Sequence, residues 1–226
     1  MKQESNLGDR RPLATREKTW AKRLAIAIAE RGFTPNSISI VGLVVGVLAG
    51  VAFVMTDIFP RGDRSFWLVG AVLVQCRLLS NMLDGMVAIE SNHISPLGEL
   101  FNEVPDRISD VCILIGIGYA ADASPSLGYL AAVMAVLVAY MRAEGKIAGA
   151  EQCFVGPMAK PHRMFTVTLL ALAQSFVPSD WRIIEFGESV ISLPDLTLCV
   201  IIIGCLLTFV RRLKRVSEDL NRRRSI

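Results

Sequence analysis

Six apolar stretches alternate with polar ones along the chain, and each approaches the length that a helix needs to cross a bilayer. They cover residues 37–56, 66–89, 97–121, 127–141, 164–177 and 196–210. The first contains no charged residue, so a helix formed by it would have no polar face to turn toward water. A soluble protein that buries apolar helices is the alternative. The pattern favours an all-α integral membrane protein with six transmembrane helices.

A different pattern precedes the first stretch. Trp20, Leu24 and Ile28 recur at every fourth position, which places them on one face of a helix, and basic residues occupy other faces. This spacing predicts an N-terminal amphipathic helix that lies in the cytoplasmic membrane interface. Gly32 is expected to end that helix, and Pro35 stands near the first position of the next one. A disordered basic tail is the alternative.

Charge is placed unevenly along the chain. Of its 226 residues 52% are hydrophobic, which excludes a disordered protein, and 20% are charged. With six spans, nineteen Lys and Arg residues fall on the side that holds both termini, and three fall on the opposite side. Cytoplasmic segments of membrane proteins carry such an excess. We therefore expect a multi-pass protein of the cytoplasmic (inner) membrane, with both termini and the active site on the cytoplasmic side.

The predicted organisation has three parts. Residues 1–33 form the amphipathic cytoplasmic segment, residues 34–215 the six-helix transmembrane catalytic domain, and residues 216–226 a basic cytoplasmic tail. Four of the five Cys residues lie within the spans, so no disulfide framework is expected. No nucleic acid is expected as a partner.

Polar residues form a stripe on the second and third predicted helices. Arg77, Asn81, Asp84 and Ala88 are four, three and four residues apart, so they share one helical face. On the next helix the same spacing relates Glu99, Asn102, Glu103, Asp106 and Asp110. A short loop makes the two helices antiparallel, so their stripes can face each other. Carboxylate and amide oxygens suit a hard cation, and the pattern predicts a site for Mg²⁺ or Mn²⁺.

The stripe has an excess of negative charge. It holds six carboxylates, namely Asp84, Glu90, Glu99, Glu103, Asp106 and Asp110, and two basic residues, Arg77 and Arg107. The alternative to a metal site is a buried polar seam in which these groups pair with one another. Two Arg residues cannot neutralise six carboxylates. Bound cations, protonated carboxyl groups or entering water would have to compensate for the difference.

The spacing of the stripe resembles the signature of the CDP-alcohol phosphotransferase (phosphatidyltransferase) family, D-x2-D-G-x2-A-R-x8-G-x3-D-x3-D. The matching positions here are Asn81, Asp84, Gly85, Ala88, Ile89, Gly98, Asn102 and Asp106. Every gap between them is kept, and the resemblance extends over nearly the whole chain. Three positions depart from it, because two aspartates are Asn and the arginine is Ile. The resemblance implies six spans and a homodimer.

The resemblance also implies roles for these residues. Asp84 would be a metal ligand, and Asp106 would lie near the metal and act as general base. Asn81 and Asn102 would be weaker, neutral ligands, and Glu103 could restore one charge. The nucleotide would be held near Gly85, Ala88, Gly98 and Arg77.

The implied reaction is displacement at phosphorus. An acceptor hydroxyl attacks the substituted phosphate of a CDP-alcohol, with CDP-diacylglycerol as the favoured donor, CMP leaves, and a phospholipid or its precursor forms in the membrane. The loop after the fourth span carries Arg142, Lys146, Lys160, His162 and Arg163, which could hold a phosphate on the acceptor. Ordinary positive-inside charge is the alternative for them. A degenerate homologue that binds nucleotide, lipid or a partner without turnover is the alternative function.

Overall fold

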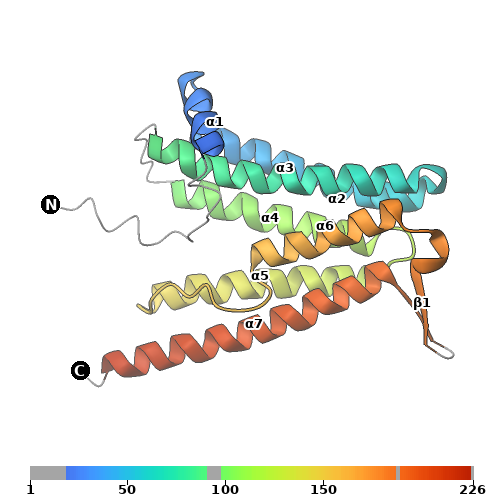
Figure 1. The fold of residues 1–226 in the computed structure, drawn as a ribbon. Helices are drawn as coiled ribbons and strands as arrows, with labels where there is room; N and C mark the ends of the chain where they lie inside the picture. The colour runs from blue at the N-terminus through green and yellow to red at the C-terminus, as the bar shows by residue number, and fades with distance from the viewer. Residues whose placement is uncertain (1–18, 91–97, 187–188, 225–226) are drawn as a thin grey trace.

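The computed structural model describes residues 19–90, 98–186 and 189–224, which form a bundle of helices with one short hairpin (Figure 1). In chain order the elements are α1 (Thr19–Glu30), α2 (Pro35–Ile58), η2 (Pro60–Gly62), α3 (Asp63–Glu90), α4 (Gly98–Gly118), α5 (Pro125–Ile147), α6 (Lys160–Phe176), η3 (Ser179–Trp181), β1 (Ile183–Phe186), β2 (Ser189–Ser192) and α7 (Leu193–Arg224). The predicted all-α class is confirmed. The antiparallel β1–β2 hairpin, which pairs Ile183 with Ser192, was not expected.

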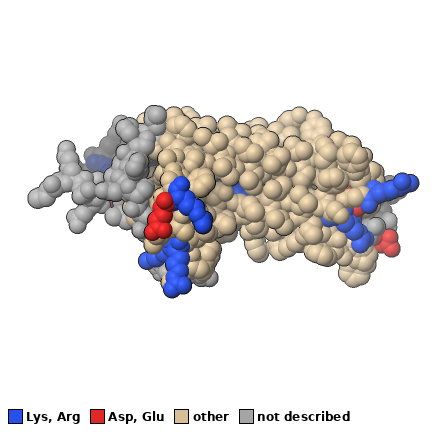
Figure 2. Space-filling view, turned by 90° about the horizontal axis from the view of Figure 1, so that it is seen from above, with Lys and Arg blue, Asp and Glu red and all other residues tan. Residues whose placement is uncertain are grey.

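The surface of the bundle is suited to a bilayer. In the part of the chain that the structure describes, α2, α3, α5 and α7 are long and apolar enough to cross a membrane. On the face shown in Figure 2, charged side chains gather toward the two ends of the molecule, and the surface between them is almost entirely uncharged. Large apolar side chains such as Val41, Val51, Val72 and Val133 are exposed there. The protein is therefore an integral membrane protein.

The remaining two long helices differ from these four. Helix α4 carries charged residues over its first half, and α6 has 17 residues. Both lie alongside the other helices in the same bundle (Figure 1). The first predicted span and its start are reproduced by α2, which begins at Pro35. The Thr34 side chain accepts a hydrogen bond from the Ser37 N–H (3.2 Å) and so caps it.

Helix α1 covers part of the predicted amphipathic segment, whose residues 1–18 lie outside the described part. It ends before Gly32, which has a positive φ of 81° and donates its N–H to the Ala29 carbonyl (2.9 Å). Its buried residues are Ala21 and Ala25, which pack on α3. Trp20 is 49% exposed. The protein therefore covers the alanine face, and contact of the Trp20 face with the membrane interface stays a prediction.

One continuous apolar core holds the long helices together. It includes Phe53, Trp67, Ile113, Met164 and Leu198, one from each of five helices. Helix α2 packs on α3 and α4, α4 on α5, and α5 on α7, while α3 also contacts α6. The C-terminal end of α3 and the N-terminal end of α4 lie at the same end of the bundle, and α6 begins farther along it, where its first residue, Lys160, reaches Asp106 of α4 (Figure 1).

Candidate active site

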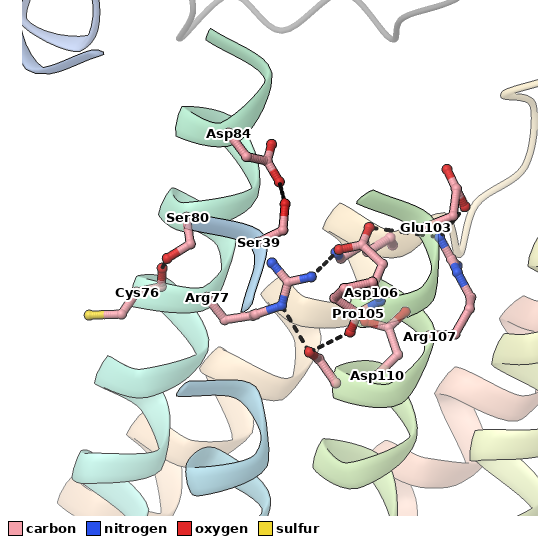
Figure 3. Close-up of polar contacts among 12 residues, drawn as sticks. Ser39, Cys76, Arg77, Ser80, Asp84, Glu103, Pro105, Asp106, Arg107 and Asp110 are labelled. Atoms are coloured by element: carbon pink, nitrogen blue, oxygen red, sulfur yellow. Dashed lines mark hydrogen bonds and ion pairs between the residues drawn. The ribbon is translucent and has the colours of Figure 1, made fainter. Parts of the chain in front are cut away.

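The polar stripes predicted on the second and third apolar segments lie on α3 and α4, and their side chains face each other (Figure 3). Arg77 extends from α3 toward Asp106 on α4, and Asp84 lies two turns farther along α3. Asp84, Asp106 and Arg77 are 5%, 5% and 2% exposed. Buried ionised groups are costly unless they are paired, so the partners of each one decide what the site can do.

The α3 side of the site presents oxygen atoms. Asp84 accepts a hydrogen bond from the Ser39 hydroxyl of α2 (2.8 Å). One turn before it, the side-chain oxygen of Asn81 is buried and has no hydrogen-bond partner among the described residues. A buried acceptor without a donor loses its hydration and gains nothing in return unless a donor or cation meets it. Asn81 and Asp84 together therefore favour a cation at this end.

The α4 side is occupied by positive charge. The Arg77 guanidinium pairs with Asp106 through Nη2 and donates from Nε to the Ser109 hydroxyl (3.0 Å). The Ser109 hydroxyl in turn donates to the Pro105 carbonyl (2.7 Å), which fixes its orientation. Arg107 lies 3.7 Å from the second carboxylate oxygen of Asp106. Two nitrogen atoms of Arg77, a residue of α3, are therefore bonded to side chains of α4.

Basic residues of α5 and α6 complete this network. Lys160, the first residue of α6, places its Nζ 2.5 Å from Asp106 Oδ1. Arg142 of α5 pairs with Glu103 and stacks over the Phe154 ring at 5.8 Å. Two of the five residues predicted to hold an acceptor phosphate thus reach the α4 carboxylates.

Arg163 is 1% exposed, and its Nη2 lies 2.5 Å from Asp110 Oδ2. Its Nη1 donates to the Met158 carbonyl (3.2 Å). This guanidinium is buried between helices and fixes the start of α6. Lys146 and His162 are exposed. Of the predicted phosphate-binding residues, Lys160 and Arg142 are the ones nearest Asp106 and Glu103.

The remaining predicted residues lie around the same end of the bundle. Gly85 and Ala88 are on the last turns of α3, and Gly98 is the first residue of α4. Asn102 is exposed on α4. Glu103 bonds Arg107 at 3.0 Å as well as pairing with Arg142. Glu103 is therefore engaged by two guanidinium groups.

The structure adds basic residues of other helices to the charges counted on the stripe alone. Pairing of Arg77 and Arg107 with the carboxylates, the alternative to a metal site, is present. Three further cations also converge from α5 and α6. Among the described side chains, four carboxylates meet five basic groups: Asp84, Glu103, Asp106 and Asp110 against Arg77, Arg107, Arg142, Lys160 and Arg163. The side chains of Glu90 and Glu99 lie outside the described part.

Two contacts could not be read from the sequence. Ser39 lies in an otherwise apolar span, and its bond to Asp84 joins residues 45 positions apart. The second contact is the bond from Arg77 to Ser109 of α4. Ser109 lies three residues after Asp106, so it shares the helical face of the stripe, and this spacing was the one signal in the sequence for its role.

Few side chains of metal-ligating type gather at one point in the described part of the site. Within the described ranges, no three His, Cys, Asp or Glu side chains come close enough together to hold a metal ion. The amides at positions 81 and 102 account for part of this, because the family signature has carboxylates there. What remains is the Asp84 carboxylate and the unpartnered Asn81 oxygen, both ligand types that Mg²⁺ and Mn²⁺ accept.

Comparison with known proteins gives one family and related synthases. The sequence model of the CDP-alcohol phosphatidyltransferase family matches residues 33–210. The archaetidylinositol phosphate synthase of Pyrococcus horikoshii is 26% identical over 151 residues, which cover 67% of this chain and 76% of that protein.

Solved structures share the fold. The crystal structure of Mycobacterium tuberculosis phosphatidylinositol phosphate synthase with CDP-DAG bound superposes with a TM-score of 0.67 at 21% identity, over 87% of this chain and 92% of that one. The same enzyme in complex with manganese and citrate gives a TM-score of 0.68 at 21% identity, over 87% and 88% of the two chains. These structures show that the helical fold is shared.

Proposed function

Because the chain belongs to the CDP-alcohol phosphatidyltransferase family, we propose that it transfers a substituted phosphate from a CDP-linked lipid to a phosphorylated alcohol. CDP-diacylglycerol is the favoured donor. The membership itself establishes an integral membrane phosphotransferase of phospholipid synthesis. The names of its relatives describe products with an inositol phosphate headgroup, which supports a phosphorylated polyol as acceptor.

One observation carries this proposal: Lys160 of α6 reaches the signature carboxylate Asp106, with Nζ 2.5 Å from Oδ1. A basic group for an acceptor phosphate and a carboxylate for the acceptor hydroxyl thereby lie side by side. Arg142 adds a second basic group, which pairs with Glu103, three residues before Asp106 on α4. An acceptor that carries both a phosphate and a hydroxyl can span these groups.

The residues would act as follows. The acceptor phosphate draws Lys160 away from Asp106, and the Asp106 carboxylate, which stays paired with Arg77, takes the hydroxyl proton. The hydroxyl oxygen bonds to the phosphorus that bears the lipid, the bond from that phosphorus to its bridging oxygen breaks, and CMP leaves. A divalent Mg²⁺ or Mn²⁺ at Asp84 and Asn81 would neutralise charge on the pyrophosphate. Arg77, Gly85, Ala88 and Gly98 would border the nucleotide.

We also propose that all six helices α2–α7 cross the membrane. Helix α4 would be about 31 Å long and α6 about 25 Å, close to the thickness of the hydrocarbon core. The described ends of α1 and α7 lie at the same end of the bundle, as an even number of spans requires (Figure 1). The excess of basic residues supports a cytoplasmic location for that end and the site. A homodimer, implied by the family, stays a prediction.

The test is CMP release by the purified full chain in lipid nanodiscs with Mg²⁺ or Mn²⁺. CDP-diacylglycerol is offered with inositol phosphate, glycerol phosphate, inositol and serine, and the lipid product is identified by mass spectrometry. We expect CMP release with a phosphorylated polyol and little with its unphosphorylated counterpart. Absence of CMP across a wide panel of donors and acceptors would instead support the degenerate homologue that binds without turnover.

A further inference from the structure

Arg77 is a fixed cation inside the site. Its side chain is 2% exposed, and its guanidinium is held by Asp106 and by the Ser109 hydroxyl (3.0 Å from Nε). Both partners belong to α4, whereas Arg77 belongs to α3. A guanidinium cannot be deprotonated in proteins. The position next to Asp106 therefore carries a permanent positive charge.

The packing of α2 is shaped around this guanidinium. A Cβ atom added at Gly42 would lie 3.2 Å from Nη1 of Arg77 and 3.0 Å from the Cβ of Ser80. A Cβ added at Gly46 would lie 2.7 Å from Oγ of Ser109, the atom that holds Nε. All three distances are shorter than ordinary van der Waals contacts. Two glycines on one face of α2 thus leave room for Arg77 and for the group that fixes it.

Lys160 adds a second positive charge to the same carboxylate, at 2.5 Å from Oδ1 of Asp106, with its side chain 13% exposed. Farther along α3, one and two turns beyond Arg77, the site has the oxygen of Asn81, which has no hydrogen-bond partner among the described residues, and the carboxylate of Asp84. The two sides therefore differ in charge. A divalent ion is attracted to the α3 side and repelled from the side that Arg77 and Lys160 occupy.

From this asymmetry we infer that the site binds a single divalent ion at Asn81 and Asp84, and that Arg77 takes the place of a further metal ion at Asp106. The inference rests on the proposed function, which supplies the metal. It explains why amides at positions 81 and 102 are compatible with the site: fixed cations need fewer carboxylates to balance them. Arg77 thus becomes a determinant of metal stoichiometry.

The first test counts metal ions. Mn²⁺ is titrated into the purified full chain in nanodiscs, and free Mn²⁺ is measured from its electron paramagnetic resonance signal. We expect one Mn²⁺ per chain at saturation. Two or more bound ions, or no binding at all, would overturn the inference. Since this measurement requires no substitution, it stands even where a variant fails to fold.

The second test changes the charge of Arg77. R77Q is expected to raise Mn²⁺ affinity at least about tenfold, because a positive charge close to the ion is removed. R77K keeps the charge and should stay within about threefold of the parent affinity. R182Q is the matched control, because Arg182 forms an Arg–carboxylate pair with Asp63 near the opposite end of α3 and should leave Mn²⁺ affinity unchanged. A folded R77Q protein with unchanged or weaker Mn²⁺ affinity would contradict the inference.

A third variant locates the ion. N81D adds a carboxylate on the α3 side and should tighten Mn²⁺ binding by at least about tenfold. CMP release is measured separately on the same preparations. Unchanged affinity would place the ion elsewhere and overturn the inference. A chain that binds one Mn²⁺ but releases no CMP keeps this inference and loses the proposed function. A chain that releases CMP with two Mn²⁺ bound supports the proposed function and overturns this inference.

Discussion

At the scale of residues, the site is defined by what Asp84 and Asp106 touch. Both belong to the family signature and both are buried, yet one bonds a neutral hydroxyl and the other bonds cations. The same residue type can therefore serve two purposes: Asp84 can give its charge to a metal, whereas Asp106 stays paired with Arg77 and can exchange Lys160 for an acceptor.

This difference predicts different losses for the two isosteric substitutions. D106N should lower CMP release at least about 100-fold, because an amide cannot take the acceptor proton. D84N should cause the larger loss of Mn²⁺ affinity, because it removes the charge on the α3 side. CMP release and Mn²⁺ titration on the same preparations distinguish the two effects.

D122N is the matched control for both. Asp122 is exposed and has a positive φ of 60°, a conformation that Asn adopts readily. Its substitution should change neither quantity. If D106N retained turnover, Asp106 would lose its role as base. If D84N bound Mn²⁺ as tightly as the parent, Asp84 would no longer be a ligand.

At the scale of elements, close approach of helices positions the signature residues. Helix α4 meets α5 at Gly118 and Gly128, where a Cβ atom on Gly128 would lie 2.8 Å from the Cα of Gly118. Backbone atoms cannot move aside as a flexible side chain can. This contact fixes the end of α4 opposite to Asp106 and, through the rigid helix, its tilt in the bundle.

G128A should therefore destabilise the protein by about 1–3 kcal/mol, the usual consequence of overpacking. Thermal unfolding in detergent, followed by circular dichroism, measures the effect as a lower Tm. G62A is the matched control, since a Cβ on Gly62 would meet Phe66 at an ordinary 3.5 Å. Equal Tm values for the two variants would show that the α4–α5 contact can accommodate an added methyl group.

At the scale of the whole molecule, the two ends of the bundle are chemically different. One holds the candidate site and the described ends of α1 and α7, and the other holds η2 and the β1–β2 hairpin (Figure 1). On the face that Figure 2 shows, the surface between them is almost entirely uncharged, as a membrane-embedded surface would be. Locating either end of the bundle on the cytoplasmic or the outer side of the membrane therefore also locates the candidate site.

Single cysteines can report that side. In a background whose five native Cys are replaced, K214C lies near the α7 end and D180C near the hairpin, and both parent residues are exposed. A membrane-impermeant maleimide should label D180C in intact cells and K214C only after permeabilisation, because basic segments stay in the cytoplasm. The opposite labelling pattern would place the candidate site on the outer side.

Much of the fold follows from local patterns in the sequence. The start of α2 at Pro35 and the end of α1 before Gly32 are set by short-range capping geometry. The polar stripe on α3 is set by the helical period. The hairpin at Ile183 escaped prediction, since its four-residue strands are too short to carry a periodic signal.

The sequence by itself determined which residues share a helical face, and hence that Asn81, Asp84 and Asp106 could form one site. Only the tertiary structure decided the charge of that site. Arg142 and Lys160 lie 36 and 54 residues beyond Asp106 in the chain, yet they reach the α4 carboxylates. Coulombic energy depends on distance in space and not along the chain. A stripe with excess negative charge in sequence thereby becomes, once folded, a site with its own cations.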